Sequence, residues 1–227
     1  MTETILILGG TKEAAALAAS LVAEKPNARI VTSLAGRTRE PKPVAGETRT
    51  GGFGGADGLA TWLQTEGVSQ VIDATHPFAE QISKNALAAC ERTGTPLEVR
   101  KREPWQKQPG DTWREATNIH QAVAMIPAGA RVLLALGRQH IAPFAEREDV
   151  WFLVRMVDAP SEQLDLPAHE LLLQRPSAEA DDEQQVLLEH QITHIVCRNS
   201  GGPGAYAKIE AARELSLPVI MIARPQG

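Results

Sequence analysis

One histidine of the sequence stands where a ligand is expected to bind. His76 follows the apolar run 70–72 within the stretch 73–79 (Asp-Ala-Thr-His-Pro-Phe-Ala), and alanines at helical spacing come after it. Open α/β sheets bind ligands just outside the carboxyl ends of their strands. A histidine at such a place can donate a proton, orient a substrate, or cap the helix that follows. His76 is therefore the candidate catalytic residue, with a structural capping role as the alternative.

A glycine turn near the start of the sequence is suited to binding a phosphate. The apolar run 5–8 is followed by Gly9, Gly10 and Thr11, and then by apolar residues at helical spacing. Glycine permits positive φ and close backbone approach, and the N–H groups that begin a helix favour an anion. The dinucleotide fingerprint GxGxxG is incomplete, because Thr11 replaces its second glycine. We predict a phosphate-binding loop here, with a purely structural turn as the alternative.

The end of the next expected strand, residues 28–33, indicates which dinucleotide would bind. An Asp or Glu at this point holds the ribose 2′-hydroxyl of NAD, whereas arginine accommodates the 2′-phosphate of NADP. The sequence has no acid here and instead offers Ser33, Gly36, Arg37 and Arg39. These residues favour NADPH, and the alternative is that both arginines are solvated loop charges.

Basic and small residues recur near the strand ends expected in the second half of the sequence. Such positions suit the anionic groups of a ligand. The candidates are Arg138, Arg155, Arg198, Ser200, Gly201 and Lys208. The Walker spacing GxxxxGK[ST] is absent from the glycine-rich loop 199–204, which excludes an NTPase of that class. A lone arginine in a turn is also a common surface residue.

The composition is that of an ordinary globular protein. The 227 residues are 43% hydrophobic, and no apolar run approaches the roughly 18 residues of a membrane span. A net charge of −5 gives no general attraction to nucleic acid. Cys90 and Cys197 lie outside any metal-binding spacing, so no metal is expected. With no export signal before the first apolar run, we expect a cytoplasmic protein without membrane or nucleic-acid partners.

Strands and helices are expected to alternate along the whole sequence. Apolar runs of strand length lie at 5–8, 28–33, 70–72, 96–99, 131–136, 151–157, 171–174, 194–198 and 218–222. Helical spacing separates most of them, including residues 139–147, while the glycine-dense stretch 49–55 is predicted as a loop. This alternation predicts parallel α/β architecture. The charged, proline-containing segment 100–110 divides it into domains at 1–103 and 104–227.

Taken together, the motifs resemble those of the precorrin-6A reductase family of cobalamin biosynthesis, which includes the cobalt-precorrin-6A reductases. The resemblance runs in order along nearly the whole sequence. It is carried by residues 8–11, 33–37, 73–79 with Ile82, Ser83 and Asn85, 199–202, 207–208 and 224–225. The sequence departs from the family pattern at Arg198, where lysine is expected, and at 174–177, where a glycine-rich turn is expected.

The resemblance implies an NADPH-dependent oxidoreductase acting on a CH-CH group, which reduces a double bond of precorrin-6A to give precorrin-6B. It implies two Rossmann-like three-layer domains with an interdomain cleft, NADP(H) on the first and the tetrapyrrole contacting the second. Thr75, Pro77 and Phe78 are then expected near the nicotinamide, and Ser83 near the substrate. A cobalt-containing substrate is one alternative, and a non-catalytic NADP(H)-binding sensor is another. A monomer is expected.

Overall fold

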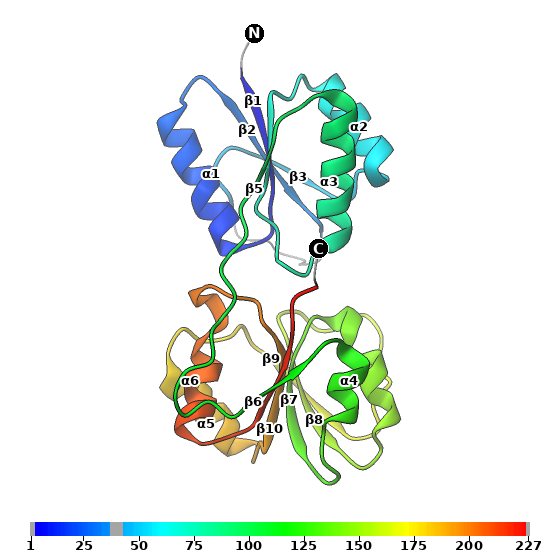
Figure 1. Cartoon of the computed structure of the whole chain (residues 1–227), viewed down its shortest axis with the longest axis vertical. Coiled ribbons are helices and arrows are strands. Elements are labelled where there is room, and N and C mark those ends of the chain that lie inside the picture. The colour runs from blue at the N-terminus through cyan, green and yellow to red at the C-terminus, as the bar shows by residue number, and fades with distance from the viewer. Residues whose placement is uncertain (1–2, 37–42, 226–227) are drawn as a thin grey trace. The chain divides into compact units, whose positions relative to one another are not determined.

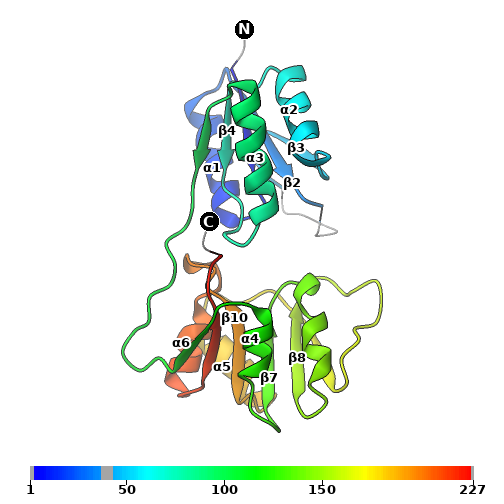
Figure 2. The same ribbon diagram turned by 45° about the vertical axis from the view of Figure 1, so that its right-hand side comes forward.

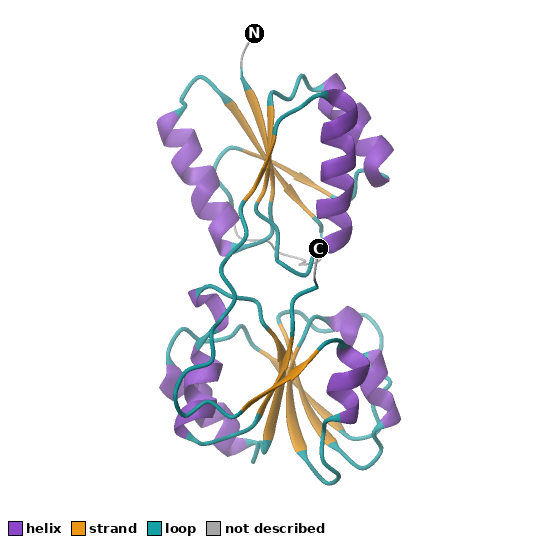
Figure 3. Ribbon diagram, in the orientation of Figure 1, coloured by secondary structure: helices purple, strands orange, loops and turns teal. Residues whose placement is uncertain are grey.

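The chain forms two compact α/β units, Met1–Arg102 and Glu103–Gly227 (Figure 1). The computed structural model describes residues 3–36 and 43–225. The division falls within the segment 100–110 that was expected to connect two domains. Each unit contains one parallel sheet with helices on both of its faces (Figure 3).

The first unit has a five-stranded sheet in the order β3-β2-β1-β4-β5, and all its neighbouring strands are parallel. Its strands are β1 (Thr4–Leu8), β2 (Arg29–Leu34), β3 (Glu47–Thr50), β4 (Gln70–Asp73) and β5 (Leu97–Val99). Its helices are α1 (Lys12–Glu24), α2 (Gly55–Thr65) and α3 (Glu80–Thr93).

The core of the first unit follows from the two-residue period of a strand. Successive side chains of β1 point to opposite faces of the sheet, so both faces must be covered. Ile5 and Ile7 pack with α1, whereas Leu6 and Leu8 pack with α2 and α3. Figure 2 shows α2 and α3 together on one face. All five residues of β1 are buried, as the apolar run 5–8 predicts for four of them.

The second unit has a six-stranded parallel sheet in the order β6-β11-β10-β7-β8-β9. Its strands are β6 (Trp113–Ala116), β7 (Arg131–Ala135), β8 (Trp151–Met156), β9 (His169–Leu173), β10 (His194–Arg198) and β11 (Val219–Ile222). Its helices are α4 (Ile119–Ala124), α5 (Ala180–Glu189), α6 (Ala207–Glu214) and the 3₁₀-helices η1 (Arg138–His140), η2 (Ala142–Glu146) and η3 (Pro203–Ala205).

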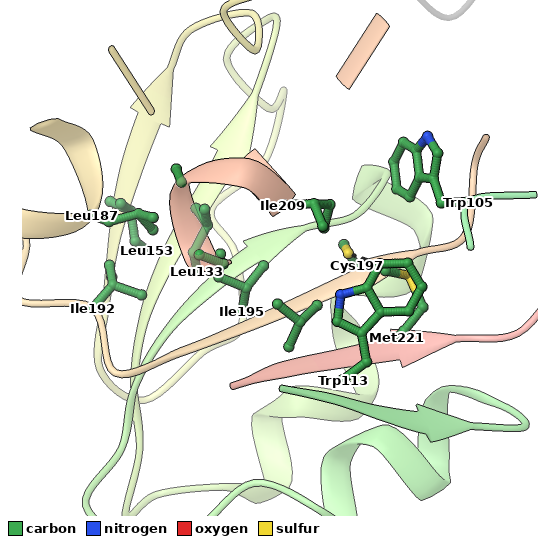
Figure 4. Close-up of a cluster of buried hydrophobic side chains, with 13 residues drawn as sticks. Trp105, Trp113, Leu133, Leu153, Leu187, Ile192, Ile195, Cys197, Ile209 and Met221 are labelled. Carbon is green, nitrogen blue, oxygen red and sulfur yellow. Dashed lines mark hydrogen bonds between the residues drawn. The ribbon is translucent and has the colours of Figure 1, made fainter. Parts of the chain in front are cut away.

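Two helical layers enclose the second sheet. On one face, Leu187 of α5 and Ile209 of α6 belong to a buried cluster that includes Trp113 and Met221 (Figure 4). On the other face, η2 contributes Phe144, whose ring lies edge-on to that of Phe152 of β8 at a centroid distance of 5.8 Å. The strand β11 lies between β6 and β10 and therefore belongs wholly to the second sheet.

The two parallel sheets confirm the predicted α/β fold, but three local predictions were wrong. The predicted loop 49–55 begins inside the edge strand β3, and the edge strand β6 was not predicted. The predicted helix 139–147 is a pair of 3₁₀-helices instead. Pro143 has no N–H group to donate to the preceding turn, which explains why a continuous α-helix does not form there.

Within residues 3–36 and 43–225, no helix is long and apolar enough to cross a lipid bilayer. The same residues contain no group of three or more His, Cys, Asp or Glu side chains that could hold a metal ion.

Candidate active site

The glycine turn and the histidine stretch meet at the switch point of the first sheet. From β1 the chain adds β2 and β3 on one side and then β4 and β5 on the other. Leu8 and Asp73, the last residues of β1 and β4, are paired in register. The loops that follow them therefore begin side by side at the place where doubly wound sheets bind ligands.

Thr11 ties these two loops together. Its Oγ1 donates a hydrogen bond to the carbonyl oxygen of Ala74 at 2.9 Å and accepts one from the N–H group of Ala14 at 3.0 Å. Thr11 is thereby the N-cap of α1. Since the hydroxyl hydrogen is already used, any contribution of Thr11 to phosphate binding comes from its backbone and from the helix that it caps.

The glycines of the turn are required by their surroundings. The N–H group of Gly9 donates to the carbonyl oxygen of Ser33 at 3.0 Å, and a Cβ atom on Gly9 would stand 2.8 Å from Cγ2 of Thr32. Gly10 has a φ of +100° and open space around it. The turn thus gives an exposed backbone at the start of α1, which is the geometry that a phosphate group uses.

The stretch 73–79 is fixed by one buried carboxylate. Asp73 is 4% exposed, and its Oδ1 accepts hydrogen bonds from the N–H group and from Oγ1 of Thr75, at 3.1 and 2.6 Å. Its Oδ2 accepts a hydrogen bond from Oγ of Ser83 at 2.5 Å. Ser83 was expected to contact the substrate, but its proton is directed to Asp73. Its hydroxyl instead joins α3 to the turn before it.

Replacing Ser83 with alanine should lower the free energy of unfolding of the first unit by about 1.5–3 kcal/mol, the usual value of a hydrogen bond to a charged group. Hydrogen exchange of the β1 and β4 amides would measure this loss. Ser20→Ala is the matched control, because Ser20 also donates to a carboxylate, that of Glu24, but on the exposed surface of α1. Equal protection in Ser83→Ala and the unaltered protein would contradict the structural role.

The hydrogen bonds around His76 define which ring nitrogen carries the proton. Its Nδ1 accepts from the N–H group of Phe78 at 3.3 Å, and its carbonyl oxygen accepts from the N–H group of Ala79 at 2.7 Å. A neutral ring whose Nδ1 is an acceptor carries its hydrogen on Nε2. In this neutral form Nε2–H can donate a hydrogen bond to a ligand, whereas donation of a proton requires the ring first to take up a proton on Nδ1 in place of the Phe78 contact.

His76 does not cap the following helix. α3 begins at Glu80, its N-cap is Ala79, and that cap has no side-chain hydrogen bond. The capping alternative is therefore wrong. Thr75, His76, Pro77 and Phe78 form a half-buried turn before the helix.

Of the residues expected to bind the 2′-phosphate, Ser33 and Gly36 lie within the described part of the chain. Arg37 and Arg39 are outside the described residues. Gly36 follows β2 with a φ of +72°, and Ser33 near the end of β2 is buried. The Oγ of Ser33 accepts a hydrogen bond from Nη1 of Arg49 at 2.8 Å. Sequence reasoning missed Arg49, which lies in the polar strand β3 and was assigned to a loop.

The second sheet has its own switch point, between β7 and β10. The loops after these neighbouring strands carry two groups of predicted substrate contacts, Arg138 on one side and the segment 198–201 on the other. Arg138 is exposed, and no carboxylate of a described residue lies within ion-pair distance of it. Arg138 therefore remains suited to an anionic group of a ligand.

The glycine-rich loop after β10 forms hydrogen bonds with Trp105, near the start of the second unit. The side-chain amide of Asn199 accepts from the N–H group of Trp105 at 2.7 Å and donates to its carbonyl oxygen at 3.0 Å. The indole Nε1 of Trp105 donates to the carbonyl oxygen of Gly202 at 2.7 Å. Gly201 is buried, and a Cβ atom there would lie 2.1 Å from the carbonyl oxygen of Glu103. The structure thus assigns Gly201 to packing against the backbone of the chain.

Two other predicted anion-binding residues point into the protein. Lys208 is 4% exposed, and its Nζ donates to the carbonyl oxygen of Ala205 at 2.5 Å and lies 4.7 Å from the ring centroid of Trp105. Burial lowers the pKa of Lys208. Arg155 is 5% exposed and donates from Nη1 to Oε2 of Glu183 at 2.6 Å. Both cations are thus buried against groups of the protein, whereas Arg198 and Ser200 are half-buried.

Two doubly wound parallel units, with a glycine turn at the first switch point, define an α/β protein of the class that binds ligands at strand ends. The chain belongs to the precorrin-6x reductase CbiJ/CobK family, whose model matches residues 4–227.

Individual relatives agree with this family. The chain is 47% identical over 223 residues to a precorrin-6A reductase of Rhodococcus erythropolis, covering 97% of this chain and 89% of that protein. A solved structure of CobK precorrin-6A reductase matches with a TM-score of 0.93 and 46% identity, covering 100% of this chain and 89% of that chain. A cobalt-precorrin-6A reductase of Priestia megaterium is 29% identical over 236 residues, covering 98% and 91%.

These similarities confirm the predicted family and the predicted enzyme class. The chain is an oxidoreductase of cobalamin biosynthesis, and a reductase requires a reduced cofactor.

Proposed function

We propose that the chain reduces precorrin-6A, with NADPH as its reduced cofactor. The observation that carries the choice of substrate is the identity of 47% to a precorrin-6A reductase, against 29% to a cobalt-precorrin-6A reductase. Both comparisons cover nearly the whole chain, so the higher identity to the precorrin-6A reductase does not come from one domain alone.

The first unit offers the residues that would hold the cofactor. The exposed backbone of Gly9 and Gly10 and the start of α1 suit the pyrophosphate. Ser33 and Gly36, at the end of β2, suit the adenosine side, and the turn 75–78, after β4, suits the nicotinamide side. These assignments agree with the order of the strands, because β2 and β4 flank β1 on opposite sides.

When bound, NADPH supplies a hydride to one carbon of a C=C bond, and a proton added to the other carbon completes the reduction and leaves NADP⁺. His76 would donate this proton from its protonated ring, in which a proton on Nδ1 replaces the hydrogen bond from Phe78, or its neutral ring would orient the macrocycle through Nε2–H. The turn that carries His76 is rigid, since Asp73 fixes Thr75 and Ser83 on either side of it. In the second unit, Arg138, Arg198 and Ser200 would contact carboxylates of the macrocycle.

The test is a spectroscopic assay of the purified protein with two substrates and two cofactors. Precorrin-6A and cobalt-precorrin-6A are each incubated with NADPH or with NADH, and the visible spectrum of the macrocycle is followed. We expect the fastest change with precorrin-6A and NADPH. Faster reduction of the cobalt-containing macrocycle would overturn the choice of substrate. Cofactor binding without any change of either macrocycle would instead support a non-catalytic sensor.

A further inference from the structure

Arg49 occupies a place at the sheet edge that neither the motifs nor the relatives assign to a function. It is the third residue of β3 and is paired in register with Ser33 of β2. Neighbouring residues in register on parallel strands project to the same face of a sheet. Accordingly, Nη1 of Arg49 donates to Oγ of Ser33 at 2.8 Å. Arg49 thus lies where the adenosine side of the cofactor is expected.

The guanidinium of Arg49 is held in one orientation by neutral groups. Its Cζ lies 3.7 Å from the ring centroid of Phe53 and 5.8 Å from that of Trp62. Nη1 also donates to the carbonyl oxygen of Gly51 at 3.0 Å, and Nη2 donates to that of Gly52 at 3.1 Å. A cation fixed in this way loses little further freedom when it binds an anion.

Among the described residues, the charge of Arg49 has no carboxylate partner. No acidic side chain of a described residue lies within ion-pair distance of it. Arg29, at the opposite end of the same two strands, shows the contrast: it pairs with Glu47 at 2.8 Å and with Glu66 at 2.6 Å. Partial burial lowers the pKa of Arg49, although an arginine stays protonated at neutral pH. A half-buried cation without a carboxylate is suited to an anionic ligand.

Arg49 also has hydrogen-bond donors to offer. A guanidinium has five N–H groups, and the hydrogen bonds to described residues use Nη1 twice and Nη2 once. Nε–H and the second hydrogen of Nη2 make no hydrogen bond to a described residue. Two neighbouring N–H groups of this kind match two oxygens of a phosphate.

We propose that Arg49 binds the 2′-phosphate of NADPH and contributes to the preference for NADPH over NADH. This inference rests on the proposed function and extends it to a residue outside the segment 33–39. The ends of β1, β2 and β3 follow one another along the sheet edge. Strands are about 4.8 Å apart, so the end of β3 lies ~10 Å from the glycine turn, a span that a ribose with its phosphates bridges.

The experiment measures binding without turnover. Dissociation constants are determined by calorimetry for NADPH, NADH, adenosine 2′,5′-bisphosphate and 5′-AMP, with the unaltered protein, Arg49→Gln, Arg49→Lys and the control Arg92→Gln. Arg92 is an exposed arginine of α3 that pairs with Asp57. Arg49→Gln should weaken binding of both ligands with a 2′-phosphate by about 10- to 100-fold. NADH and 5′-AMP should change by less than about 3-fold, and Arg92→Gln should bind like the unaltered protein.

The ratio of the NADH and NADPH dissociation constants is the decisive quantity, because a general disturbance of the fold weakens both ligands together. Arg49→Lys keeps the charge but loses the planar fork, and it should therefore give an intermediate ratio. An unchanged ratio in both variants would show that Arg49 only shapes the turn, which overturns the inference. If the unaltered protein binds no dinucleotide, or binds NADH as tightly as NADPH, the proposed use of NADPH fails, and the role of Arg49 fails with it.

Discussion

Replacement of His76 by alanine is expected to slow the single-turnover reduction of precorrin-6A by about 10²- to 10⁴-fold, the contribution of a positioned general acid. The reason is the place of His76 just after β4, at the strand end proposed for the nicotinamide, from which its protonated ring can pass a proton to the macrocycle. An excess of enzyme with bound NADPH is mixed rapidly with the substrate, and the absorption of the macrocycle is followed. This single-turnover rate is measured separately from product release.

Glutamine at position 76 separates proton donation from orientation. Its amide N–H can replace Nε2–H as a hydrogen-bond donor, but it cannot transfer a proton. Recovery of most of the rate in His76→Gln would assign an orienting role, whereas a loss as large as that of alanine would assign proton donation. His169→Ala is the control, because His169 lies at the amino end of β9, away from the strand ends of that sheet that bind ligands. An unchanged rate in His76→Ala would exclude both roles.

Replacement of Glu183 by glutamine should lower the free energy of unfolding of the second unit by about 3–5 kcal/mol. Glu183 is 2% exposed, and its two oxygens accept hydrogen bonds from Arg155 and from the N–H group of Ser177. Nε and Nη2 of Arg155 have no hydrogen-bond partner among the described residues, so Glu183 is its essential partner. Without the carboxylate, the buried guanidinium is left uncompensated.

Urea titration followed by tryptophan fluorescence measures this change, because Trp105, Trp113 and Trp151 all lie in the second unit. The double variant Arg155→Met with Glu183→Gln should recover much of the loss, since it removes the unpaired charge and keeps an acceptor for Ser177. Asp149→Asn, which breaks an exposed pair with Arg147, should leave the transition almost unchanged. A double variant no more stable than Glu183→Gln would contradict the electrostatic explanation.

The parts of the fold that sequence patterns predicted are those with one dominant physical cause. β1, β7 and β10 are central strands buried on both faces, so they appear as continuous apolar runs. The edge strands β3 and β6 have the sequences Glu-Thr-Arg-Thr and Trp-Arg-Glu-Ala. Both are short and contain few apolar residues, so they show no apolar periodicity, whereas the edge strands β5 and β9 keep enough apolar residues to be predicted.

The sequence predicts which loops form the candidate site, but it does not predict which groups the side chains of these loops contact. Parallel strand ends share one edge, which is why the turn at Gly9 and the turn at His76 could be expected to meet. The partners of Ser83, Lys208 and Arg155 depend on how helices pack against the sheet, and a single sequence does not contain that information. Arg49 was missed for the same reason, because its significance lies in its register with Ser33.

The place of β11 in the second sheet has a consequence for how the protein folds during its synthesis. Among the described residues β11 is the last strand in sequence order, yet it lies between β6, the first strand of its unit, and β10. Every strand of the first unit precedes β6 in the sequence, so that unit can fold before the second one is complete. The second unit instead waits for residues 219–222 to emerge, and until then β6 has no neighbour in its sheet. An arrest of translation shortly before β11 is therefore expected to leave a folded first unit attached to an incomplete and protease-sensitive second one.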